Sequence, residues 1–153
     1  MNEIDPKLPS KRYGILIVGL PRRHAAILFP LRMGFVPLRK HLHKIGRADT
    51  PTCQACGEAP ETVPHYILYC PAFNHPRSAM SFELGDNVHS LTALFTNAGS
   101  LRLLFRYIHR TRRFEEHFGC MSLPPAKEIM EKAKKQGLKD KGKEKQQKRN
   151  EQR

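Results

Sequence analysis

Four potential metal ligands lie close together near the middle of the chain, and their spacing constrains its fold more than any other feature. Cys53 and Cys56 are separated by two residues, eight residues then lead to His65, and four more lead to Cys70. Three thiolates and one imidazole are a donor set that closed, tetrahedral structural zinc sites use. The spacing therefore predicts that these four side chains bind Zn²⁺ as a structural ion.

The two halves of this motif predict different local structures. A Cys-x-x-Cys pair is expected in a tight turn that directs both sulfurs toward one point. The second half predicts a short helix over residues 63–69, capped by Thr62 and ended by Pro71. His65 and Cys70 would lie roughly 140° apart on a regular α-helix, so Cys70 is expected on a last turn that unwinds.

Other roles for the cysteines stay open at this level. A disulfide is disfavoured because a basic chain without a secretory signal is expected in the nucleus or cytoplasm and not outside the cell, and disulfides seldom persist in those compartments. A catalytic zinc site would need an open coordination position, which four protein ligands would fill. Cys120 is expected to be a free thiol; it would replace Cys70 as a ligand only if the helix before it folds back.

The composition bounds the size of the core and the kind of partner. A chain of 153 residues without tryptophan has room for one domain with a modest core, which a bound metal would help to stabilise. Lysine and arginine number 27 against 14 acidic residues, a net charge of +13, which favours polyanions as partners. No apolar run approaches the ~20 residues of a membrane span, so we expect no membrane insertion.

Apolar periodicity predicts a mainly α fold. Residues 11–18 favour a helix, with a strand as the alternative. Further helices are expected over 21–32 with a kink or break at Pro30, over 38–45, over 88–95, and from 101 to Gly119 with Ser100 as its cap. The side chains expected to face the core are Ala25, Leu28 and Leu31; Leu38, Leu42 and Ile45; Leu91, Leu94 and Phe95; and Leu101, Leu104, Phe105 and Ile108.

Three segments follow from these patterns. Residues 1–9 are expected to be a lead-in loop, and residues 10–119 a small helical module stapled by the zinc site at 53–70. Residues 120–153 are a basic, low-complexity tail with 11 basic and 5 acidic residues after Pro125. We expect this tail to be disordered or partly helical, with transient helix over 126–135.

Basic residues gather before the zinc site and suit contacts with a phosphate backbone. They are Arg22, Arg23, Arg39, Lys40, Lys44 and Arg47. Tyr66 and Tyr69 are candidates for stacking on unpaired bases, as aromatic residues do in proteins that bind single strands. The alternatives are a solvated helix face for the cations and packing against the ligand turn for the tyrosines.

A family resemblance rests on several segments taken together. They are Leu-Pro-Arg-Arg-His-Ala-Ala at 20–26, Leu-Arg-Met-Gly-Phe-Val-Pro-Leu at 31–38, His-Leu-His-Lys-Ile at 41–45, and the Cys-Cys-His-Cys motif. Together they resemble the segment downstream of the RNase H domain in fungal non-LTR retrotransposon reverse transcriptases. The resemblance covers residues 8–76 and, more weakly, the helix through 114. It implies that Cys53, Cys56, His65 and Cys70 are zinc ligands in a module that contacts nucleic acid.

No catalytic pattern accompanies this motif. The chain has no Tyr-x-Asp-Asp sequence and no glycine-rich phosphate loop, and its four aspartates are scattered. We therefore expect no enzyme activity and favour a zinc-stabilised module that binds RNA or single-stranded DNA. One alternative is a protein-interaction module that docks on a polymerase or another protein, and another is a relic of a mobile element without a function.

Overall fold

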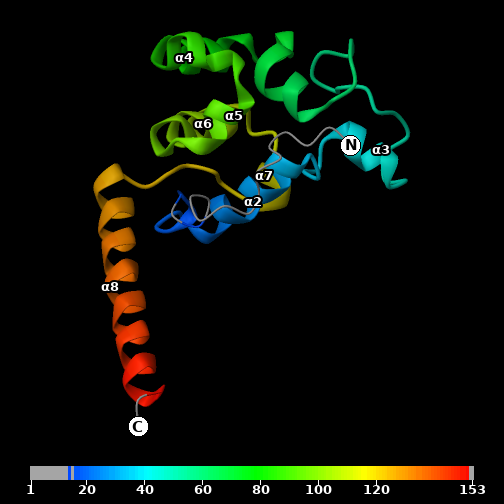
Figure 1. Cartoon of the computed structure of the whole chain (residues 1–153). Coiled ribbons are helices and arrows are strands. Elements are labelled where there is room, and N and C mark those ends of the chain that lie inside the picture. The colour runs from blue at the N-terminus through cyan, green and yellow to red at the C-terminus, as the bar shows by residue number, and fades with distance from the viewer. Residues whose placement is uncertain (1–13, 15, 152–153) are drawn as a thin grey trace.

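The computed structural model describes Gly14 and residues 16–151, with side chains beyond residue 137 described only at Gln147. The predicted mainly α fold is confirmed: helices form most of this part of the chain (Figure 1). In order they are α2 (Arg22–Met33), α3 (Arg39–Lys44), η1 (His65–Tyr69), η2 (Pro71–Phe73), α4 (Asn74–Leu84), η3 (Gly85–His89), α5 (Leu91–Thr96), α6 (Ala98–Thr111), α7 (Glu115–Phe118) and α8 (Ala126–Glu151). The described residues form no strand, only an isolated antiparallel bridge between Thr52 and Pro60.

The predicted N-terminal elements lie largely outside the described residues. The loop expected over 1–9 lies outside the described residues, and of the helix expected over 11–18 the described residues Gly14, Leu16 and Ile17 are helical. Chain direction then changes at Gly19, which has a φ of 87°. The helix expected from Pro21 begins one residue later, with Pro21 in the N-cap position of α2.

Pro30 does not break α2, so of the predicted kink or break the break is wrong, and the kink stays a prediction. The helix continues through Pro30 to Met33, and Gly34 ends it in the left-handed conformation. A proline removes one backbone hydrogen bond, yet Leu31 and Arg32 just after it are buried, and the Phe35 N–H donates to the Pro30 carbonyl at 2.9 Å. Burial of the last turn offsets the missing bond.

The long helix expected from 101 to Gly119 consists of two helices. α6 ends at Thr111, Arg112 adopts a left-handed conformation with φ of 54°, and α7 follows. Asn97, not Ser100, caps α6, because its side chain accepts a hydrogen bond from the Gly99 N–H. The bend at Arg112 directs Phe114 into the core, where it is fully buried.

Packing of α2, η1 and α4 to α6 builds one core (Figure 1). The predicted stripe Leu101, Leu104, Phe105 and Ile108 is buried, as are Leu28, Leu31, Leu38, Leu94 and Phe95. Ile45, expected to face inward, is 50% exposed because α3 ends at Lys44 and leaves it at the C-cap. The apolar periodicity thus located about half of the core cluster and missed residues such as Ile27, Tyr107 and Phe114.

The tail departs furthest from expectation. Of the two alternatives for the tail, disordered or partly helical, the structure shows a helix. This helix, α8, extends over Ala126–Glu151, well beyond the expected 126–135, and projects away from the body (Figure 1). Its first turns approach Gly19 so closely that an added Cβ there would lie 2.6 Å from the Ile129 carbonyl oxygen. Met121 is buried in the core, so packing continues beyond Cys120. Among the described residues, no helix has both the length and the apolar character needed to cross a bilayer.

Two side chains at the start of α2 hold the segment that precedes α8. Arg23 donates to the carbonyl of Cys120 at 2.9 Å, and the Nε2 of His24 bonds to the carbonyl of Met121 at 3.0 Å. His24 is 1% exposed and meets the ring of Phe105 edge to face. Because a carbonyl can only accept, the His24 Nε2 carries the proton and its buried Nδ1 stays unprotonated.

This arrangement predicts a pH dependence of folding. Burial lowers the pKa of His24 below its usual 6.5, so the unfolded chain binds a proton more readily than the folded one. The stability contribution is present above about pH 6.5 and is lost as the pH falls from there toward the folded pKa. Urea unfolding of the metal-loaded protein between pH 5 and 8 measures this effect. As the pH falls, the free energy of unfolding should decrease more steeply for the wild type than for His24→Gln. Equal pH dependences of the two proteins would contradict the role given to His24.

Candidate metal centre

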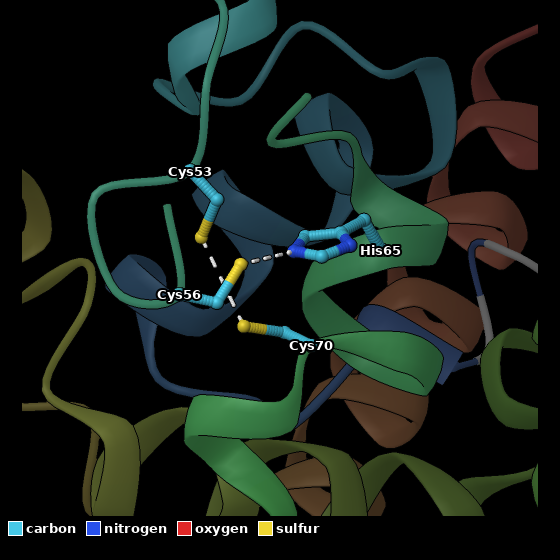
Figure 2. Close-up of side chains that lie close together, drawn as sticks. All are labelled: Cys53, Cys56, His65 and Cys70. Carbon is cyan, nitrogen blue, oxygen red and sulfur yellow. Dashed lines mark hydrogen bonds between the residues drawn. The ribbon is translucent and has the colours of Figure 1, made fainter. Parts of the chain in front are cut away.

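The four predicted ligands converge on one point (Figure 2). Their ligand atoms, three sulfurs and one imidazole nitrogen, all lie within 4.8 Å of one another. Cys53 and Cys70 are buried, His65 is 9% exposed, and Cys56 lies nearer the surface. The structure thus brings together a Cys₃His cluster that can bind a metal ion.

Backbone hydrogen bonds shape the first half of the site. The Cys53 N–H donates to the Ala59 carbonyl and the Gly57 N–H to the Cys53 carbonyl, both at 2.8 Å. Gly57 has a φ of 71°, which only glycine adopts without strain, and this lets the chain turn back toward the Thr52–Pro60 bridge. The Glu58 N–H lies 3.5 Å from the Cys56 sulfur. The predicted tight turn is therefore present, closed at its base.

The second half of the site, η1, is a π-helical turn. This turn removes the separation of roughly 140° between His65 and Cys70 that a regular α-helix would impose. Thr62 caps it as predicted, because its hydroxyl accepts from the His65 N–H at 3.1 Å. The Cys70 N–H then donates to the His65 carbonyl, an i to i+5 bond of 2.7 Å. The wider turn brings Cys70 back over His65, and Cys70 leaves the helix with ψ of 119°. The predicted unwinding occurs, together with a widening that the sequence pattern did not predict.

The interatomic distances separate a metal site from a disulfide. The sulfurs of Cys53 and Cys70 are 3.8 Å apart, and the Cys56 sulfur is 3.4 Å from the His65 Nε2 (Figure 2). A disulfide requires about 2.05 Å, so the thiols are free. A tetrahedral ion with metal–sulfur bonds of about 2.3 Å places its sulfurs about 3.8 Å apart, and an imidazole nitrogen at about 2.0 Å lies some 3.5 Å from each sulfur. These two distances match those of a tetrahedral centre, and the other pairs of ligand atoms lie within 4.8 Å.

Local electrostatics differ between the two ends of the cluster. Hydrogen bonding from the Glu58 N–H lowers the pKa of Cys56, which favours the thiolate that a metal requires. Burial raises the pKa of Cys70 to about 12, so its thiol keeps the proton at neutral pH unless a cation replaces it. Metal binding must therefore release protons, and acid must favour metal loss.

Polar contacts to the backbone hold η1 in place. Arg77 on α4 donates to the carbonyls of Ile67 and Cys70 at 2.9 and 2.7 Å. The hydroxyl of Tyr107 on α6 donates to the carbonyl of Tyr66. The bonds to Tyr66 and Ile67 satisfy carbonyl groups at the end of the turn that the helix itself leaves free, and the Cys70 carbonyl also accepts from the Phe73 N–H. They tie the ligands on η1 to α4 and α6.

Glu61 joins the metal-binding loop, the segment from Cys53 to His65, to two other parts of the fold. Its side chain is fully buried and accepts two bonds from the guanidinium of Arg113, at 2.6 and 2.7 Å. One of its oxygens also accepts from the Arg39 N–H at the start of α3, at 2.7 Å. Its own N–H donates to the Pro51 carbonyl. Sequence reasoning missed this residue, because its partners are far away along the chain.

The predicted cationic cluster is divided between two helices. Arg22 and Arg23 lie in the first turn of α2, roughly 18 Å along that helix from its end, after which α3 carries the others. Lys40, Lys44 and Arg47 are exposed and form no ion pair among the described residues. Arg39 is partly buried. The structure therefore places three free cations on or just after α3.

Tyr66 cannot stack on a base, and its assignment to a nucleic-acid contact is wrong. It is fully buried; its hydroxyl shares a hydrogen bond of 2.6 Å with Thr111, and its ring packs against Phe73 and Phe114. Tyr66 instead packs in the core beside the turn that carries the ligands, which was the alternative expected from the sequence. Tyr69, at the end of the same turn, is 66% exposed.

Cys120 does not join the cluster. It is an exposed free thiol whose sulfur lies 3.3 Å from the Ser122 hydroxyl, and this contact lowers its pKa. Cys70 fills the fourth ligand position, as its local spacing predicted.

Comparison of the chain with protein-family models, with curated proteins and with solved structures finds no match.

Proposed function

We propose that this protein is a zinc-stabilised module that binds RNA or single-stranded DNA and has no catalytic site of its own. The Cys₃His cluster carries the proposal, since it supplies a closed set of ligands and leaves no coordination position for a substrate. Zn²⁺ is the ion that suits three thiolates and one imidazole in a tetrahedral arrangement. Bound there, it would join the loop before η1 to the turn itself.

Charge supports the proposed partner. The chain carries a net charge of +13, and such an excess attracts polyanions. The exposed cations of α3 have no acidic partner among the described residues and are therefore free for phosphate groups. α3 also precedes the metal-binding loop directly and hydrogen bonds to it through Glu61. The zinc would thus hold the helix that carries the cations.

The resemblance to the C-terminal segment of non-LTR retrotransposon reverse transcriptases supports the same proposal. That segment is non-catalytic and follows the domains that perform the chemistry, so an origin in such an element accounts for a metal-binding motif beside a basic surface. The segments that carry the resemblance are those containing α2, α3 and the four ligands.

Salt dependence of binding tests the proposed function. Fluorescence anisotropy with a labelled 20-nucleotide single strand should show affinity falling steeply between 50 and 200 mM salt, with a logarithmic slope of about −0.7 per neutralised phosphate. Lys40→Gln with Lys44→Gln should make the slope less negative by about 1.4, because two contacts are lost. A flat titration of the zinc-loaded protein would refute nucleic-acid binding.

A matched control removes the same charge elsewhere. Arg106 and Arg112 are already paired with Glu83 and Glu115, so they have less to offer to a phosphate. Arg106→Gln with Arg112→Gln should therefore change the slope less than the α3 pair does. Equal effects from both double variants would show that net charge alone governs binding.

The second candidate function is docking on another protein, such as a polymerase. The observation that favours it is Phe82 on α4, which is 91% exposed. Large exposed apolar side chains often mark protein contacts. Co-elution with a polymerase fragment that depends on Phe82, at a salt concentration where polyanions no longer bind, would support this role.

A further inference from the structure

An aromatic pair, made of the exposed Phe35 and the partly buried His41, lies beside the free cations of α3. Phe35 is 42% exposed, and its ring lies 5.7 Å from that of His41, centroid to centroid, with the planes tilted by 46°. The pair joins the turn after α2 to α3. Neither Phe35 nor His41 belongs to the buried core cluster.

The backbone holds Phe35 in its exposed position. Gly34, with φ of 74°, turns the chain, and the Phe35 N–H donates to the Pro30 carbonyl at 2.9 Å. The next residue, Val36, is fully buried and anchors the segment from the other side. An exposed phenylalanine fixed in this way is an apolar surface presented to solvent at little further cost in entropy on binding.

Cations adjoin the aromatic pair along α3. At about 100° per residue, Lys40, Lys44, His41 and Ile45 follow one another around an arc of about 140° of the helix. The lysines are exposed, and Ile45 is 50% exposed. Asp49, before Cys53, and Glu58, after Cys56, form no ion pair with these lysines. This face of α3 therefore has the two lysines at one edge and His41, with Phe35 against it, in the middle.

We propose that Phe35 and His41 form a stacking platform for an unpaired base, whose flanking phosphates contact Lys40 and Lys44. A duplex hides the faces of its bases, so only a single strand can offer both a base face and nearby phosphates to such a surface. The inference rests on the proposed function and narrows it: the partner is a single strand, held by stacking as well as by charge.

Phe35→Leu tests the platform, because it keeps an apolar side chain and removes the aromatic face. Affinity for an oligo(dT) or oligo(U) 20-mer should fall about tenfold at fixed salt. The salt slope and the affinity for a duplex of equal length should stay unchanged, since no charge is altered. Phe82→Leu, at another exposed phenylalanine on α4 at the far side of the molecule from α3 (Figure 1), should leave all of these values as in the wild type.

A spectroscopic signal reports stacking directly, because the chain contains no tryptophan. Emission from the Phe35→Trp variant should be quenched by the single strand, and that from Phe82→Trp should not. Zinc content and thermal unfolding of each variant establish that the fold is retained.

The outcomes separate the two proposals. Unchanged affinity of Phe35→Leu, with salt-dependent binding intact, would overturn the platform and leave the proposed function standing. Absence of binding to any strand by the wild type would overturn both. Equal losses on single strands and duplexes would overturn the platform. A fourth result would also overturn the platform: Phe35→Leu weakens binding to phosphatidylserine vesicles but leaves the affinity for oligonucleotides unchanged.

Discussion

Replacing Cys53 with serine should leave the purified protein without bound metal and largely unfolded around residues 51–70. Cys53 is a buried member of the Cys₃His cluster, and removing one of four ligands opens the site. Binding of structural zinc contributes on the order of 10 kcal/mol or more, which matches or exceeds the whole folding free energy of a typical domain. Elemental analysis and thermal unfolding followed by circular dichroism measure the two effects.

Cys120→Ser is the matched control, since Cys120 is an exposed thiol outside the cluster. That variant should retain one zinc ion per chain and the Tm of the wild type. A chelator should reproduce the effect of Cys53→Ser on the wild type, more readily as the pH falls, because the pKa of the buried Cys70 thiol is raised and protons compete with the metal. A Cys53→Ser protein with unchanged Tm would show that the metal does not stabilise this fold.

Glu61→Gln should cost about 3 kcal/mol of folding free energy, or roughly 6–12 °C in Tm. Glutamine keeps the shape and can still accept from the Arg39 N–H, but it leaves the guanidinium of Arg113, only 18% exposed, without a counter-charge. Breaking a buried pair from one side costs far more than the pair contributes when intact. Urea unfolding of the zinc-loaded protein measures the change.

Glu115→Gln provides the comparison, because Glu115 pairs with the neighbouring arginine, Arg112, at the surface. Both partners of that pair are exposed, so its loss should cost less than about 1 kcal/mol. Similar losses in the two variants would mean that burial of Glu61 does not strengthen its pairing. A large loss at Glu61 alone would identify this residue as the link between the metal-binding loop, α3 and the turn between α6 and α7.

Local sequence information was sufficient for the ligand set and for most helices. Cys53, Cys56, His65 and Cys70 could be recognised because a metal site built from two short segments leaves its spacing in the chain. The stripe from Leu101 to Ile108 could be recognised because its periodicity is that of a helix with one buried face.

Predictions failed where a residue's environment is set by distant segments. Pro30 was expected to kink or break its helix, but burial of the following turn keeps α2 unbroken. Tyr66 carries no local sign that Phe73, Phe114 and Thr111 will enclose it. An aromatic residue next to a ligand looks the same in sequence whether it faces solvent or the core.

By itself, the sequence determined that this chain is mainly helical, strongly basic and equipped with a Cys₃His set, since periodicity, charge and ligand spacing are properties of neighbouring residues. Only the tertiary structure decided that Glu61 is buried against Arg113, that Tyr66 is enclosed, and that Phe35 is exposed beside the lysines of α3. Burial depends on which distant surfaces pack together, and the free energy of that packing is shared among residues too far apart for a local pattern to record.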